Sequence, residues 1–228
     1  MEYDIEKYLI SLKKPKIAEH SQRFFKTAVG EYGYGDIFLG IRVPIIRKAV
    51  KKYQNANIAV ATKLLASKYH EIRLFALLLL VARFNKYQNE QQKIYNIYLN
   101  NTKYINNWDL VDSSAHHIVG SYLQNKDKNI LIKLAKSDSL WERRIAVIAT
   151  YYFIKNNEFE YTFNVAKLLL NDKEDLIHKA VGWMLREVGK KNLKSEKHFL
   201  EKHHNKMPKV MLRYAIEKFS KENKKLYQ

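Results

Sequence analysis

The feature that most restricts the fold of this chain is its scarcity of turn-forming residues. Only seven Gly and three Pro occur among 228 residues, too few for the many tight turns of a β-sandwich or β-barrel. Apolar residues instead recur at intervals of three and four in the segments 71–84, 141–154 and 178–188, on faces broad enough to pack on both sides. The sequence therefore predicts an all-α protein.

Short polar linkers separate the predicted helices. Residues 136–139, 171–175 and 190–196 carry the Asn, Asp and Ser residues that cap helices and form turns. No long disordered tether interrupts the chain. We therefore expect a single compact domain over residues 1–228.

Composition and hydropathy exclude several classes of protein. The chain has no cysteine, which excludes disulfides, iron–sulfur clusters and thiolate zinc sites. The longest apolar run, Leu74–Ala82, is about half the length that a membrane-spanning helix needs. The N-terminus lacks the basic and apolar regions of a secretion signal. We expect a soluble cytoplasmic protein that does not bind membranes.

An internal repeat becomes visible when the helices are aligned by their basic and small residues. One aligned column, with members 32 to 39 residues apart, consists of Arg73, Asp112, Arg144, Lys179 and Arg213. This period is close to that of helix-pair repeats. It predicts a right-handed solenoid of HEAT-like helix-pair repeats in which the column lies on a concave basic face.

The charge balance indicates a polyanionic partner. Forty-one Lys and Arg against 23 Asp and Glu leave a formal charge of +18, and nucleic acid is the commonest partner of such proteins. Lysine-rich composition also occurs in proteins that bind nothing acidic, so charge alone does not identify the partner. Asp112 stands out because a carboxylate among these cations weakens binding to phosphates.

Two tryptophans are candidates to act with this carboxylate. Trp108 and Asp112 are separated by four residues, which places an indole and a carboxylate on the same face of a helix. Trp183 lies one turn after a column position in a later repeat. The alternatives are that Asp112 is a first-turn acid, with Asn107 or Asp109 as the helix cap, and that the tryptophans belong to the core.

Several cations are candidates to contact phosphates. Arg144 belongs to the aligned column, whereas Arg143 does not, and both arginines have the alternative of pairing with Glu142 or facing solvent. The segment 40–53 contains basic residues and no acid, a pattern that also describes a solvated helix face. The expected phosphate contacts are Arg144, Lys179, Arg213, Arg42 and Arg47.

No motif predicts a metal or a cofactor. The adjacent pairs His116–His117 and His203–His204 point to different helix faces and lack an HExxH pattern. The chain contains none of the patterns GxxxxGK[ST], GxGxxG and GxSxG. We therefore expect no metal site and no cofactor, and neither nucleotide-driven nor acyl-transfer chemistry.

Four segments together resemble the AlkD family of DNA alkylation repair glycosylases: FLGIRVPIIR (38–47), NNWDLVD (106–112), WERRIAV (141–147) and HKAVGWMLRE (178–187). They occur in the family's order and cover most of the chain. The resemblance implies a solenoid whose concave basic face holds duplex DNA. It also implies hydrolysis of the N-glycosidic bond of cationic N3- and N7-alkylated purines, without enclosure of a flipped base, as part of base excision repair.

The resemblance also assigns roles to residues. It makes Asp112 the essential carboxylate, Trp108 and Trp183 the sugar contacts, and Arg144 the phosphate contact. Two departures concern Asn107, where the family often has an aromatic residue, and the segment 22–36, which differs from the family's. The implied partner is double-stranded DNA carrying alkylated purines. We expect a monomer that needs no protein partner and associates with the nucleoid through DNA.

Two other functions fit a helical-repeat chain. One is a catalytically inert module that binds DNA or branched nucleic acid, which would have no need for an acid on a basic face. The other is an armadillo-like scaffold that holds an extended peptide. The salt dependence of binding distinguishes the scaffold from a DNA-binding protein, because the affinity for phosphates falls steeply with ionic strength.

Overall fold

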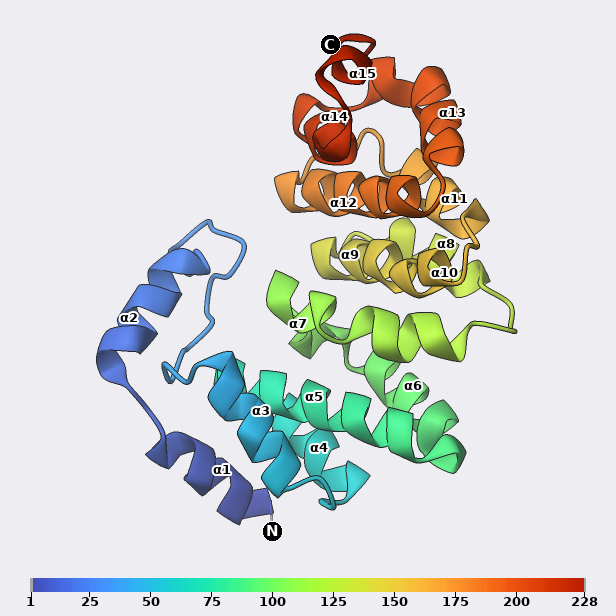
Figure 1. The fold of residues 1–228 in the computed structure, drawn as a ribbon. Coiled ribbons are helices and arrows are strands. Elements are labelled where there is room, and N and C mark those ends of the chain that lie inside the picture. The colour runs from blue at the N-terminus through green and yellow to red at the C-terminus, as the bar shows by residue number, and fades with distance from the viewer. Residues whose placement is uncertain (1, 228) are drawn as a thin grey trace. The chain divides into compact units, whose positions relative to one another are not determined.

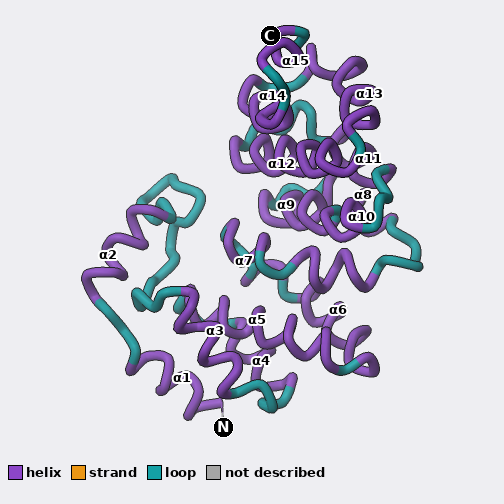
Figure 2. Tube along the Cα trace, in the orientation of Figure 1, coloured by secondary structure: helices purple, strands orange, loops and turns teal. Residues whose placement is uncertain are grey.

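The computed structural model describes residues 2–227, and their regular secondary structure is helical (Figures 1 and 2). The backbones of Ile37 and Tyr69 form an isolated parallel β-bridge that does not belong to a strand. The prediction of an all-α protein is confirmed. Contacts between Cα atoms divide the chain into two compact units, Met1–Ser114 and Ala115–Gln228. The expected single domain over 1–228, the handedness of the solenoid and its basic face stay predictions.

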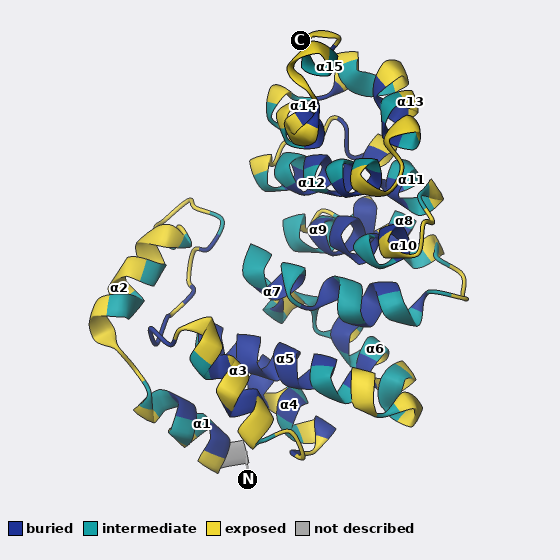
Figure 3. Ribbon diagram, viewed as in Figure 1, coloured by how far each residue is buried: buried dark blue, intermediate teal, exposed yellow. Residues whose placement is uncertain are grey.

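The first unit is organised around α5 (His70–Lys86), a helix that is buried along most of its length (Figure 3). Its apolar residues face neighbours on several sides, which matches the broad apolar face predicted for 71–84. Helices that contact α5 include α3, α4, α6 and α7. The other helices of this unit are α1 (Glu2–Ser11), α2 (Pro15–Phe24), α3 (Val43–Lys52), α4 (Ile58–Leu65), α6 (Gln91–Asn100) and α7 (Trp108–Asp112).

The second unit is organised around α12 (Asp175–Lys191), which packs against α9, α13 and α14. Its helices also include α8 (Asn129–Ala135), α9 (Leu140–Ala149), α10 (Tyr151–Lys155), α11 (Glu160–Leu168), α13 (Leu193–His203), α14 (Lys209–Ala215) and α15 (Lys221–Lys225). A π-helical turn spans His116–Gly120.

The predicted linkers are located correctly but differ in length. Ser139 caps α9, as its place in the 136–139 linker predicts, by accepting a hydrogen bond from the Glu142 N–H. The linker predicted over 190–196 is shorter than expected. Only Asn192 lies between α12 and α13, and its side chain accepts the Ser195 N–H at 3.0 Å.

Gly182 lets α12 approach α14 closely. A Cβ atom at this position would overlap the Met211 carbonyl oxygen and lie 2.6 Å from Cβ of Tyr214. We expect Gly182→Ala to lower the free energy of unfolding by at least about 1 kcal/mol, because overpacking against backbone outweighs the gain in helix propensity. Urea unfolding measures this, with the exposed Lys191→Ala on the same helix as control. Equal stability of both variants would contradict the close-packing argument.

Candidate functional site

The short helix α7 carries two of the candidate residues. Trp108 is its first residue and Asp112 its last, so the indole and the carboxylate lie one turn apart on the same helix, as predicted. The Asn107 side chain caps the helix by accepting the Trp108 N–H at 2.9 Å, and Asp109 is the first-turn acid. Since Asp112 lies at the opposite end from the cap, its alternative role as a first-turn acid is wrong.

Asp112 lies beside a buried polar pair. The Tyr98 hydroxyl is fully buried and lies 3.0 Å from the Ser114 hydroxyl. Burial raises the pKa of Tyr98 well above its usual range, the hydrogen bond with Ser114 opposes this shift, and the negative charge of Asp112 adds to it. Asp112 itself is half-buried.

Trp108 packs against aromatic residues from the end of α2. The Phe25 ring stacks on the indole with centroids 5.2 Å apart and an interplanar angle of 21°. The Phe24 ring meets the indole edge-on at 6.0 Å. Both phenylalanines belong to the segment 22–36 that differs from the family pattern. The sequence analysis missed their role, and the only signal for it was the adjacent aromatic pair itself.

A buried ionic cluster, consisting of Asp36, His70, Arg73 and Asp109, lies next to this stack. His70 Nδ1 is 3.0 Å from Asp36 and Nε2 is 2.8 Å from Asp109, so both ring nitrogens face carboxylates. Arg73 donates to the other oxygen of Asp36 at 2.6 Å. The sequence analysis placed Arg73 in a basic column on a concave face. That placement is wrong, because Arg73 is only 5% exposed and is paired with Asp36.

The cluster shifts the pKa values of two of its members. Burial acts to raise the pKa of Asp36, but the hydrogen bond from His70 and the charge of Arg73 lower it to about 2. Burial acts to lower the pKa of His70, but the charge and hydrogen bond of Asp109, together with those of Asp36, raise it to about 9. At neutral pH both ring nitrogens of His70 therefore carry protons and donate to the two carboxylates.

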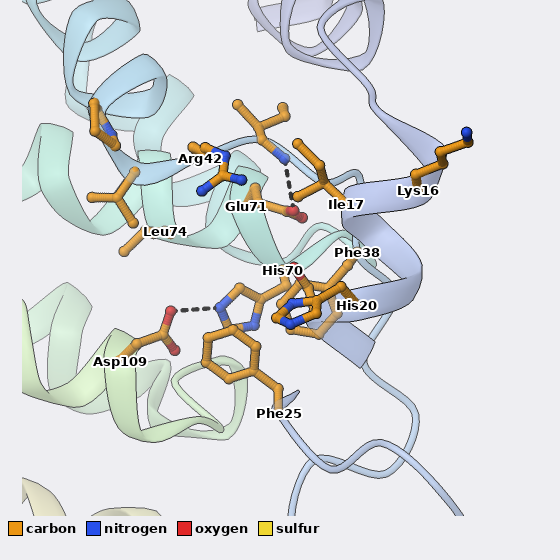
Figure 4. A pocket seen from close by; sticks show the side chains of 14 residues that line it. Lys16, Ile17, His20, Phe25, Phe38, Arg42, His70, Glu71, Leu74 and Asp109 are labelled. Atoms are coloured by element: carbon orange, nitrogen blue, oxygen red, sulfur yellow. Dashed lines mark hydrogen bonds and ion pairs between the residues drawn. The ribbon is translucent and has the colours of Figure 1, made fainter. Parts of the chain in front are cut away.

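A cavity of about 570 Å³ lies beside the cluster, between residues of α2, α3 and α5 (Figure 4). Phe25, Phe38 and His70 form one side of it, and the Asp109 carboxylate points toward the His70 ring. Arg42, one of the predicted phosphate contacts, lines the cavity and is exposed. The Glu71 carboxylate accepts hydrogen bonds from the backbone N–H groups of residues 39–41, at 2.7 to 3.1 Å.

The remaining predicted phosphate contacts differ in exposure. Arg47 on α3 and Arg213 on α14 are exposed, while Lys179 on α12 is half-exposed and pairs with Asp175 at 2.5 Å. Arg144 is only 5% exposed, and its Nη1 donates to the Leu176 carbonyl at 2.5 Å. Their contacts with phosphate stay predictions.

Arg143, which the sequence analysis left out of the phosphate contacts, has a structural role. Its Nε donates to Asp172 at 2.6 Å, and its Nη1 donates to the carbonyls of Ser137 and Asp138. These bonds join the linker that precedes α9 to the one that precedes α12. The sequence analysis gave Glu142 as the alternative partner of this arginine, whereas the acid that it pairs with at 2.6 Å is Asp172, 29 residues away.

Trp183, on α12 of the second unit, is half-buried. Its Nε1–H donates to Glu187 at 3.0 Å, one turn further along the helix. Its ring lies 6.2 Å from that of Tyr151, which in turn lies 5.4 Å from the ring of His116. Trp183 is therefore not a fully enclosed core residue. Its side chain is half-buried, its N–H is hydrogen-bonded to Glu187, and its ring contacts a half-buried tyrosine.

Two further properties follow from the described part of the chain. No group of three or more His, Cys, Asp or Glu side chains within residues 2–227 is arranged to hold a metal ion. Over the same residues, none of the helices combines the length and the apolar character needed to cross a membrane.

These features define an all-helical repeat protein in which a short helix presents an indole and a carboxylate. A family model described as DNA alkylation repair enzyme matches residues 5–219, and the chain belongs to this family. A solved structure described as a predicted DNA alkylation repair enzyme from Enterococcus faecalis has the same fold, with a TM-score of 0.70 and 16% sequence identity. The match covers 92% of this chain and 97% of that one. The comparison with curated proteins gives no significant match.

Proposed function

We propose that this protein is a DNA glycosylase that hydrolyses the N-glycosidic bond of cationic N3- and N7-alkylated purines in duplex DNA. The observation that carries the proposal is the pairing of Trp108 and Asp112, one turn apart on α7, in a member of the DNA alkylation repair enzyme family. In this reaction the bond from the sugar C1′ to the purine nitrogen breaks, and its electron pair leaves with the base, which becomes neutral. Water then bonds to C1′ and releases a proton.

Asp112 would stabilise the sugar as it becomes cationic. An alkylated purine that already carries a positive charge needs little protonation to depart, and the sugar passes through an oxocarbenium-like state. A carboxylate beside C1′ attracts this positive charge and orients the attacking water. Because the ground-state sugar is neutral, the attraction is stronger in the transition state, which is the condition for rate acceleration.

The two indoles would reinforce this effect. The face of a tryptophan ring is negative, so it attracts a cationic sugar by about 0.5 to 2 kcal/mol. Trp108 is held by the stack on Phe25, which fixes the orientation of its ring. The AlkD resemblance gives the same sugar-contacting role to Trp183. Under this proposal the alkylated base is not enclosed in a pocket, so bulky alkyl groups are tolerated.

Duplex DNA would be held through its phosphates by the predicted contacts Arg144, Lys179, Arg213, Arg42 and Arg47. The formal charge of +18 favours such binding, and three of these side chains, Arg42, Arg47 and Arg213, are exposed. Arg144 is the exception, because it is largely buried and its Nη1 donates to the Leu176 carbonyl.

The direct test is incubation of the purified chain with methylated duplex DNA, followed by chromatography of the released bases. We expect 7-methylguanine and 3-methyladenine to be released at a rate that depends on protein concentration, and duplex binding to weaken steeply as salt increases. Salt-sensitive binding without release would instead identify an inert DNA-binding repeat protein. Absence of both base release and salt-sensitive duplex binding would refute the proposal.

A further inference from the structure

The helix α7 is tied at its N-terminal end to the buried ionic cluster. Asn106 and Asn107, which directly precede the helix, each donate an amide N–H to Asp36 at 3.2 Å. Asp109, in the first turn of α7, accepts from Nε2 of His70 at 2.8 Å. Three polar contacts therefore connect this short helix and the two residues before it to side chains that lie far away in the sequence.

The cluster is itself anchored to α5 and to the preceding loop. His70 is the first residue of α5, and its backbone N–H donates to the Ile37 carbonyl at 2.9 Å. Arg73, one turn later, donates to Asp36 at 2.6 Å and to the Ser67 carbonyl at 3.0 Å. Asp36, His70 and Arg73 are each at most 5% exposed. Their arrangement is thus set by the most buried helix of the unit.

An aromatic stack links His70 to Trp108 by a second route. Phe38 stacks on His70 with centroids 4.4 Å apart, Phe25 stacks on Phe38 at 4.9 Å, and Phe25 stacks on Trp108 at 5.2 Å. The interplanar angles of these three contacts lie between 18° and 23°. The position of His70 therefore influences both the backbone of α7 and the indole that α7 carries.

We propose that Asp36 and His70 are positioning residues that hold α7, and with it Trp108 and Asp112, in the arrangement that the reaction requires. This inference rests on the proposed glycosylase function. A helix of five residues is not stable by itself, and α7 buries only Leu110 and Val111 in the core. The cluster therefore decides where the helix lies. A misplacement of about 1 Å at a reacting group is enough to slow a reaction by about 100-fold.

The protonated imidazole ring is suited to this task in a way that neutral side chains are not. It donates from two opposite edges to two carboxylates, on the 22–36 segment and on α7, while its charge balances part of theirs. Other ionisable groups around the ring are Arg73 behind Asp36, and Glu71, Lys16, His20 and Arg42 around the adjoining cavity. A glutamine can donate at one end only and carries no charge.

The test compares His70→Gln and Asp109→Asn with wild type under single-turnover conditions. With enzyme saturating methylated duplex, we expect base release to slow by about 10- to 100-fold in both variants, while duplex affinity changes by less than about threefold. The matched control is Glu90→Gln, which breaks the ion pair of Arg83 and Glu90 in the same unit without touching α7. That variant is expected to keep the wild-type rate even if its melting temperature falls.

The pH dependence of the rate separates positioning from general weakening of the fold. In wild type the rate constant should fall as the pH rises through about 9, the raised pKa at which His70 loses its proton. In Asp109→Asn the fall should move to lower pH, because one of the carboxylates that keep the proton on the ring is gone. Wild-type rates in both variants, losses matched by Glu90→Gln, or an unmoved pH midpoint would overturn the proposal.

Amide hydrogen exchange tests whether the cluster holds α7 without any measurement of activity. The Val111 N–H, which bonds to the Asn107 carbonyl at 3.2 Å, should exchange faster in His70→Gln and Asp109→Asn, while amides of α9 keep their wild-type rates. If wild type releases no base, the glycosylase proposal fails and this measurement still decides whether the cluster holds α7. Unchanged exchange at Val111 would show that it does not.

Discussion

Replacement of Asp112 by Asn is expected to reduce release of 7-methylguanine from methylated duplex DNA by at least about 100-fold. The amide keeps the size of the side chain but cannot balance the positive charge that develops on the sugar, and loss of one such electrostatic contact costs about 10²- to 10³-fold in rate. Duplex affinity should stay the same or increase, because the variant removes repulsion between a carboxylate and phosphates. Single-turnover base release and a binding titration measure the two effects separately.

The matched control is Asp138→Asn, which removes the same charge from an exposed position in the linker before α9. It should keep the wild-type rate of base release. Because the charge of Asp112 also acts on buried Tyr98, the melting temperature of Asp112→Asn must be compared with that of wild type. A folded Asp112→Asn variant that releases base at the wild-type rate would refute the catalytic assignment.

The free energy of unfolding is expected to fall in alkaline solution because of the buried ionic cluster. The pKa of His70 is raised from 6.5 to about 9 in the folded chain. Its contribution is therefore fully present below pH 6.5 and is lost as the pH rises through 9, by a total on the order of 3 kcal/mol. The pKa of Asp36 is lowered from 3.8 to about 2, so its contribution is present above pH 3.8 and is lost as the pH falls through 2.

Urea unfolding between pH 2 and pH 10 measures this dependence. His70→Gln should reduce the alkaline decrease, and Asp36→Asn should lower stability by about 3 to 5 kcal/mol near pH 6, since it leaves the buried charges of His70 and Arg73 without their shared partner. Glu90→Gln should keep the wild-type pH dependence. An alkaline decrease that is the same in His70→Gln and wild type would show that another group is responsible.

Local features of the candidate site were predictable because they depend on neighbours in the sequence. The four-residue spacing of Trp108 and Asp112 places them on one face of any helix, and Asn107 is a residue type that caps helices. The structure has both features on α7. The linker residue Ser139 is a further example, since its capping hydrogen bond also spans only three positions.

The buried ionic cluster was not predictable in this way. His70 lies 34 residues from Asp36 and 39 from Asp109, and neither distance matches a local spacing rule. Arg73 was assigned to a basic surface because its helical position repeats in later units. Its burial depends on Asp36, 37 residues away, which no periodic pattern reveals. Phe25 is a similar case, because its contact with Trp108 joins two segments that are far apart in the sequence.

The order of apolar and polar residues by itself determined that this chain is helical, where most of its linkers lie, and that an indole and a carboxylate share one helix face. These properties follow from interactions within one or two helical turns. Only the tertiary structure decided which charges are buried, which cations reach the surface and what holds α7. Those properties depend on the free energy of removing a charge from water, and that free energy is set by partners that folding brings together from distant parts of the chain.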